Sequence, residues 1–195
     1  EGTDQSHRWH IDPLDGTTNF LHGIPHFCIS VGLERDGQMV AGIIYDPIKD
    51  EMFIAEKGKG AFLNNRRVRV AARRELSASV VGCDIPHLGE RTQATTLREI
   101  ATMSARAAGL RSYGAAALDI AYVACGRFDA FFGRGLKSWD MAAGLAILRE
   151  AGAFASDAEG GADPVAKGHI ACGNEALHRE LLDVLKTARA TQPAA

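Results

Sequence analysis

The sequence lacks the features that mark membrane, fibrous and strongly nucleic-acid-binding proteins. No apolar run approaches the ~18 consecutive residues that a transmembrane helix needs. We find no internal repeat and no low-complexity linker, and apolar residues make up 46% of the chain. The net charge is only −2, which argues against a protein that mainly coats nucleic acid. The 195 residues therefore predict an ordinary globular protein of one large domain or two small ones.

Cysteine is scarce and widely spaced, at positions 28, 83, 125 and 172. No two cysteines form a CxxC pair, so the sequence offers no cysteine-based zinc or dithiol redox motif. Cys28 and Cys125 lie within apolar runs. We therefore expect buried free thiols and a location in the reducing cytoplasm.

The pattern of apolar and polar residues differs between the first part of the chain and the rest. The first part alternates apolar and polar residues between turn signals, and Asp36-Gly37 is a favoured hairpin turn. This pattern predicts an antiparallel meander over 1–72. Its strands are expected at 8–12, 27–35, 39–45, 51–55, 61–63 and 68–70.

Residues 73–195 instead alternate short apolar strands with segments of helical periodicity. We expect strands at 79–83, 110–113, 127–132, 153–157 and 169–173. We expect helices at 90–108, 115–125, 139–151 and 175–189, the first stopped by Gly109 and the last capped by Asn174. The fold class is therefore α/β, with an antiparallel sheet region (1–72) followed by a mixed α/β sheet region (73–195).

The densest chemical signal runs from Asp12 to Phe20, with the sequence DPLDGTTNF. Asp12 and Asp15 flank a proline at the end of a strand, and a backbone carbonyl beside them completes a donor set for a hard cation such as Mg²⁺. The following Gly16 and Thr17 can open a helix with free N–H groups that suit a phosphate. Metal and phosphate together indicate hydrolysis of a phosphate ester by an activated water, although Asp-Pro and Asp-Gly also occur in plain turns.

A second signal, Ser138-Trp139-Asp140, precedes a run of small residues. It places Asp140 in the first turn of a helix, where the helix dipole favours the ionised carboxylate. Taken alone, this pattern is typical of a well-capped helix.

Together the two segments resemble the two signatures of the inositol monophosphatase family. WHIDPLDGTTNF (9–20) is similar to the first signature, and WDMAAG (139–144) to the second. Stretches 55–62 and 114–119 also resemble the family, and the resemblance extends over about 7–185.

The resemblance implies a lithium-sensitive, Mg²⁺-dependent phosphomonoesterase with a layered α-β-α-β-α fold, expected as a cytoplasmic homodimer. It implies two or three Mg²⁺ ions held by Asp12, Asp15, Asp140 and the main-chain carbonyl of Leu14. It also assigns activation of the attacking water to Thr17. The remaining implied contacts are with the substrate and its phosphate, from Asp15, Gly16, Thr17, Ala116 and Asp140.

Two departures from the family pattern matter. The family uses a metal-binding glutamate and a further acid upstream of the first signature. The chain starts at Glu1 without an initiator Met, so we expect that an N-terminal piece of the protein is missing. Such a chain is expected to expose apolar surface and to be a poor catalyst alone. Second, Gly133 stands where inositol-cleaving members commonly have a sugar-binding glutamate.

The Gly133 departure leaves alternatives to inositol 1-phosphate open, namely histidinol phosphate or another sugar or nucleotide phosphate. A protein that keeps the fold for regulatory binding is a further alternative, and the basic residues Arg66, Arg67 and Arg69 bear on it. Charged side chains on an edge strand explain these arginines without a nucleic-acid partner. His22 and His26 could face the site or a partner subunit, and an exposed loop is the favoured interpretation.

Overall fold

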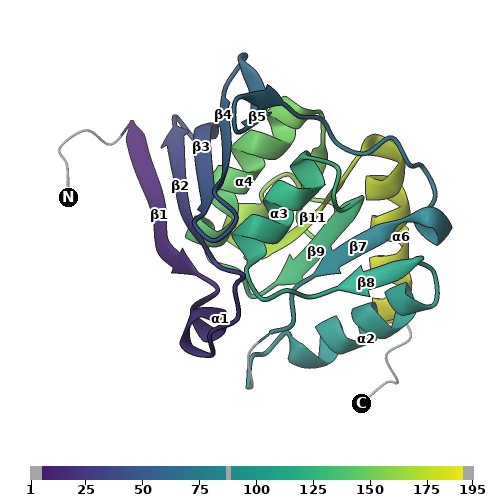
Figure 1. The fold of residues 1–195 in the computed structure, drawn as a ribbon. Helices are drawn as coiled ribbons and strands as arrows, with labels where there is room; N and C mark the ends of the chain where they lie inside the picture. Colours follow the sequence, from purple (N-terminus) through teal and green to yellow (C-terminus); the bar gives the residue numbers. More distant parts are fainter. Residues whose placement is uncertain (1–5, 87–88, 191–195) are drawn as a thin grey trace.

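Two β-sheets enclose a pair of helices in the computed structural model, which describes residues 6–86 and 89–190. The first sheet has the strand order β1-β2-β3-β4-β5-β6 and is antiparallel throughout (Figure 1). Its strands are β1 (His7–Asp15), β2 (Cys28–Arg35), β3 (Gln38–Asp46), β4 (Glu51–Glu56), β5 (Gly60–Leu63) and β6 (Arg66–Arg67). The predicted antiparallel meander is confirmed.

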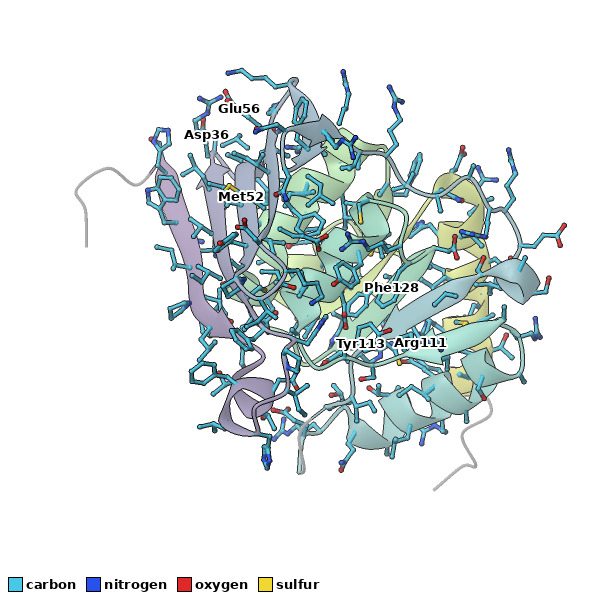
Figure 2. The ribbon with its side chains drawn as sticks, viewed as in Figure 1. Asp36, Met52, Glu56, Arg111, Tyr113 and Phe128 are labelled. Carbon is cyan, nitrogen blue, oxygen red and sulfur yellow. The ribbon has the colours of Figure 1, made fainter. Side chains whose placement is uncertain are left out.

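The hairpin turns decide where these strands begin. Asp36 and Gly37 both have positive φ (50° and 76°), as the predicted two-residue turn requires, and Figure 2 labels Asp36 at its tip. Asn64 and Asn65 form a similar turn, after which Leu63 pairs directly with Arg66. The predicted strand at 68–70 is therefore wrong, because this tight turn brings pairing back to Arg66–Arg67. These two arginines are exposed at the sheet edge.

The second sheet is mixed, as predicted, with the order β10-β11-β9-β7-β8. Its strands are β7 (Val80–Cys83), β8 (Gly109–Arg111), β9 (Ala130–Arg134), β10 (Phe154–Ser156) and β11 (His169–Gly173). Strand β7 pairs parallel to β8 and β9, whereas β11 pairs antiparallel to β9 and β10. The strand predicted at 127–132 begins later because Arg127 and Phe128 still donate backbone hydrogen bonds to Tyr122.

Helices α3 (Ala116–Ala124) and α4 (Ser138–Ala151) lie between the sheets (Figure 1). Helices α2 (Gln93–Ser104) and α6 (Glu175–Ala190) cover the other face of the second sheet through a shared apolar cluster. The described residues therefore form β-α-β-α layers of the expected layered α/β fold. Three short helices complete them: α1 (Thr17–Leu21), η1 (Leu76–Ala78) and α5 (Pro164–Lys167).

Two helix predictions need correction. Helix α2 ends at Ser104 rather than at 108, and Gly109 opens β8 instead of stopping the helix. The reason is tertiary, because the Ala108 and Gly109 N–H groups donate to the Leu76 and Ser79 carbonyls. Helix α5 was not predicted, although the Asp163 side chain caps it by accepting from the Ala166 N–H.

The two faces of the first sheet differ sharply. On the inner face, α4 approaches so closely that a Cβ on Gly42 would lie 2.3 Å from the Ala143 carbonyl oxygen. On the outer face, Trp9 is 61% exposed and Ile11 is 54% exposed. Ile11 is the first of a cross-strand apolar row that continues through Val31, Ile43 and Ile54. The expectation of exposed apolar surface on this chain is confirmed.

Candidate metal centre

The end of β1 turns two carboxylates toward the same side. In a regular strand, residues three apart point to opposite faces. Here the register against β2 shifts between Asp12 and Asp15, which pair with Ser30 and Cys28. This bulge restores a common direction. The Leu14 N–H donates to Asp12 Oδ1 at 3.0 Å and fixes the first carboxylate.

Asp15 is buried, with 8% of its surface exposed. The Ala117 N–H at the start of α3 donates to its Oδ2 at 2.8 Å, and the Cys28 thiol donates to the same oxygen at 3.7 Å. Burial raises the pKa of Asp15 from 3.8 to about 7, and the charges of Asp140 and Asp12 add to the effect. A cation beside this carboxylate would relieve the cost of ionising it.

Gly16 and Thr17 form the turn that follows. Gly16 has φ of 85°, and a Cβ there would lie 3.0 Å from the His26 carbonyl oxygen, so glycine suits this position. The Thr17 hydroxyl donates to the Leu14 carbonyl at 2.9 Å. With its proton used in this way, the hydroxyl oxygen remains an acceptor for a water hydrogen.

Asp140 comes from the other half of the chain, in the first turn of α4. Its Oδ2 accepts from the Lys137 N–H at 2.7 Å. The expectation that the helix start alone favours the charged form needs correction. Burial, and then the nearby charge of Asp12, raises the pKa of Asp140 from 3.8 to about 6.

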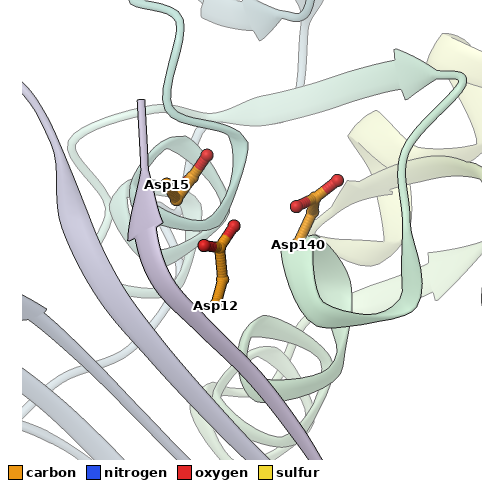
Figure 3. A group of neighbouring side chains, drawn as sticks. All are labelled: Asp12, Asp15 and Asp140. Atoms are coloured by element: carbon orange, nitrogen blue, oxygen red, sulfur yellow. The ribbon is translucent and has the colours of Figure 1, made fainter. Parts of the chain in front are cut away.

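Asp12, Asp15 and Asp140 converge, each offering an oxygen within 4.8 Å of the others. Figure 3 shows Asp12 and Asp15 on the end of β1 facing Asp140 at the start of α4. Three carboxylates at this separation repel one another, and an all-oxygen donor set fits a hard divalent cation. The donor set therefore passes a chemical test for Mg²⁺ or a similar ion.

The three aspartates open into a cleft of about 470 Å³. All the other residues assigned to the site from sequence also line this cleft: Leu14, Gly16, Thr17 and Ala116. Asp84 and Glu90, which the sequence did not single out, also line it, as does Lys137, whose place three residues before Asp140 suggests an approach to the phosphate. The cleft lies at the carboxyl ends of parallel strands β7 and β9, a common place for ligands in α/β sheets.

Gly133 is not among the residues that line the cleft. It is buried in β9, where an added Cβ would meet Leu136 Cδ1 at 3.0 Å, Asp84 Cβ at 3.2 Å and Phe131 Cε1 at 3.3 Å. The space beside it is therefore filled by three neighbours, one of them the carboxylate residue Asp84. A glutamate at 133 would require all three neighbours to shift.

Several residues beside the site were missed or misjudged from the sequence. Asn19 is buried in α1 and donates to the His26 and Tyr113 carbonyls, both at 2.7 Å. His22 is exposed, as favoured, but the His26 side chain is only 12% exposed and faces Asp119. The contacts with Tyr113 and Asp119 join distant parts of the chain, so no local pattern signals them.

The fold and this centre together define a layered α/β protein in which three aspartates that could hold a metal ion line a cleft. The chain belongs to the inositol monophosphatase family, whose sequence profile matches residues 1–190. This membership confirms the resemblance seen in the two signatures and supports a phosphatase of the inositol monophosphatase type. None of the helices in the described part of the chain has the length and apolar character needed to cross a bilayer.

Curated relatives carry two kinds of name. An "Inositol-1-monophosphatase" of Rhizobium meliloti (strain 1021) is 54% identical over 186 residues, covering 95% of this chain and 70% of that protein. A "Nus factor SuhB" of Pseudomonas aeruginosa is 42% identical over 188 residues, covering 95% of this chain and 69% of that protein. Among solved structures, the extragenic suppressor protein suhB of Bartonella henselae matches with a TM-score of 0.91 and 52% identity, covering 95% of this chain and 71% of that one.

Proposed function

We propose that this chain carries the active site of a Mg²⁺-dependent phosphatase that hydrolyses small phosphate monoesters. The observation that carries the proposal is the convergence of Asp12, Asp15 and Asp140 within 4.8 Å in the lining of a cleft. Carboxylates spaced in this way are costly to ionise unless a cation lies among them. The name of the Rhizobium relative, an inositol-1-monophosphatase, supports the same chemistry.

In this proposal the three aspartates and the Leu14 carbonyl hold two or three Mg²⁺ ions. When bound, the ions would neutralise the phosphate and lower the pKa of the attacking water. Thr17 orients that water, because its hydroxyl proton is already donated to Leu14 and its oxygen can only accept. The N–H groups of Gly16 and Thr17 bind the phosphate, and Ala116 contacts the rest of the substrate.

We infer that the substrate is inositol 1-phosphate or a related small ester, such as histidinol phosphate or another sugar or nucleotide phosphate. Gly133 favours the related esters, because β9 presents no side chain there and Asp84 fills the space beside it. Lithium sensitivity, a cytoplasmic location and a homodimer belong to the same proposal. They rest on the resemblance to the family.

A second candidate function is regulatory binding by a protein that keeps the fold. The relatives named Nus factor SuhB support it, at 41–42% identity to this chain. The exposed arginines at 66 and 67 offer a charged edge for such a contact. Under this second candidate function, the protein would have little phosphatase activity despite its aspartate cluster.

The test is phosphate release by the protein from a panel of phosphate esters, with Mg²⁺ and with chelator. We expect Mg²⁺-dependent release that falls at least about a thousandfold in both Asp12→Asn and Asp140→Asn, because bound metal supplies several kcal/mol of transition-state stabilisation. Asp183→Asn, an exposed change on α6, is the control. Release that survives both site changes would overturn the proposal, and absent release with a macromolecule bound would favour the second candidate.

A further inference from the structure

His26 and Asp119 form a buried pair beside the metal centre. Asp119 is 1% exposed in the first turn of α3, and the His26 side chain lies in the chain that links α1 to β2. His26 Nε2 and Asp119 Oδ1 are 3.5 Å apart. Neither atom has a hydrogen-bond partner of ordinary geometry among residues 6–86 and 89–190, although the Asp119 carboxylate also interacts with the Tyr113 backbone. Two buried polar atoms left in this way are costly unless they interact with each other.

The surroundings of His26 restrict its ring to this orientation. The ring packs edge-on against Tyr113, with centroids 5.0 Å apart, and against Tyr122 at 5.9 Å. Tyr113 in turn packs on Phe128, and Figure 2 labels these two rings side by side. The ring therefore has little freedom to turn Nε2 away from Asp119.

Both members of the pair connect directly to site residues. The His26 carbonyl accepts from Asn19 of α1, the short helix that begins with Thr17. Two residues before Asp119 on α3, the Ala117 N–H holds the Asp15 carboxylate at 2.8 Å. A contact between His26 and Asp119 thus joins the Thr17 turn to the helix that fixes Asp15.

We propose that the His26–Asp119 pair is a positioning contact that holds the Gly16–Thr17 turn against the start of α3, and so sets the geometry of the metal and phosphate sites. Neither side chain lines the cleft, so the pair acts through the residues that do. The proposal rests on the proposed function for its effect on turnover, but its structural effect is measurable without any substrate.

The experiment compares the full chain with His26→Phe, which keeps the ring contacts and removes the donor. Asp119→Leu removes the acceptor, and the double variant tests whether the two residues act together. His26→Gln keeps a donor at the Nε2 position and is the conservative variant. His22→Phe is the matched control, because His22 is the exposed histidine of the same connection.

Three measurements are made on each variant: hydrogen exchange of segments 16–21 and 115–119, the Kd for Mn²⁺ by calorimetry, and kcat and KM for the best ester of the panel. We expect His26→Phe and Asp119→Leu each to speed exchange of both segments and to weaken Mn²⁺ binding about tenfold, as supporting partners of metal ligands commonly do. The double variant should be no worse than the worse single one, and His26→Gln should stay near the parent chain. The loss of turnover should fall on kcat, with KM within about twofold.

The inference is overturned if His26→Phe matches the parent in exchange and Mn²⁺ affinity, or if the two single effects simply add. It is also overturned if His22→Phe behaves like His26→Phe. The two proposals fail separately. Ester hydrolysis that survives Asp12→Asn and Asp140→Asn contradicts the proposed function, while exchange and Mn²⁺ affinity still decide whether the pair positions the site.

Discussion

The two segments that supply the carboxylates are held by different forces. The first, residues 7–21, comprises the edge strand β1 and the short helix α1, and hydrogen bonds from α3 and from its own backbone fix it. The second, residues 134–140, leaves the central strand β9 and enters α4, which is packed between the sheets. The site is thus a junction between a locally shaped edge segment and a segment fixed by the core.

Burial of charge also separates the two segments. Arg134, at the end of β9, is 5% exposed and donates twice to the fully buried Glu99 of α2. Asp15 in the first segment has no basic partner of this kind in the described chain, and its pKa rises instead. Both segments therefore supply a carboxylate of raised pKa, but only the second is fixed by the buried ion pair of Arg134 with Glu99.

The largest expected effect on stability comes from removing the buried ion pair that fixes the second segment. Arg134→Met should lower the free energy of unfolding by about 3–5 kcal/mol, because it leaves Glu99 buried without its main partner. Denaturant unfolding checks this value. Arg179→Met removes an exposed i,i+4 pair with Glu175 and should cost less than about 1 kcal/mol. Equal losses in both variants would contradict the importance of the buried pair.

A smaller effect concerns the pH dependence of the first segment. The pKa of Asp15 is raised from 3.8 to about 7, so the folded chain binds a proton that the unfolded chain releases. This contribution to stability is fully present below pH 3.8 and is lost as the pH rises through 7. Between pH 5.5 and 8 in chelator, the loss from Asp15 should be about 2 kcal/mol.

Thermal unfolding of the parent and of Asp15→Asn at the two pH values isolates this contribution. The variant should lose less stability on going to pH 8, and Mg²⁺ should stabilise the parent more at pH 8 than at pH 5.5. Asp140, whose pKa burial raises to about 6, and His178, whose pKa burial lowers, are present in both proteins, so the difference between the two curves reports on Asp15. Parallel pH curves for parent and variant would rule out the assigned role of Asp15.

The smallest effect loosens the first segment without touching a carboxylate. Asn19→Ala removes the amide that donates to the His26 and Tyr113 carbonyls. We expect a cost of about 1 kcal/mol in the free energy of unfolding, since both carbonyls lose a donor. Thr18→Ala, an exposed change in the same helix, serves as the control. A cost no larger than that of the control would show that Asn19 does not fasten α1.

The sequence predicts best those features that depend only on neighbouring residues. The Asp36-Gly37 hairpin and the Asn174 cap, whose side chain accepts from the Leu177 N–H, depend on neighbouring residues and were predicted. Asp12 and Asp15 were recognised because a short motif carries both. The Asp140 segment alone was typical of any capped helix, and only its pairing with the first segment made it part of a site.

What sequence could not supply depends on contacts between distant residues. The end of α2 is set by hydrogen bonds from Ala108 and Gly109 to the chain around Leu76, and nothing near 104 signals it. The sequence favours an exposed loop for His26, but the structure buries its ring against Tyr113 and Tyr122. These partners lie far along the chain, so the local sequence does not reveal them. The raised pKa values likewise arise only after folding brings the carboxylates together.

The most direct measurement of the central claim, that both segments build one cation site, is a calorimetric titration of the protein with Mn²⁺. Parent, Asp12→Asn, Asp140→Asn and the exposed control Asp183→Asn are compared at one pH. We predict saturable binding by the parent and the control, and its loss in both site variants. Binding by Asp140→Asn with the affinity of the parent would contradict a site shared between the two segments.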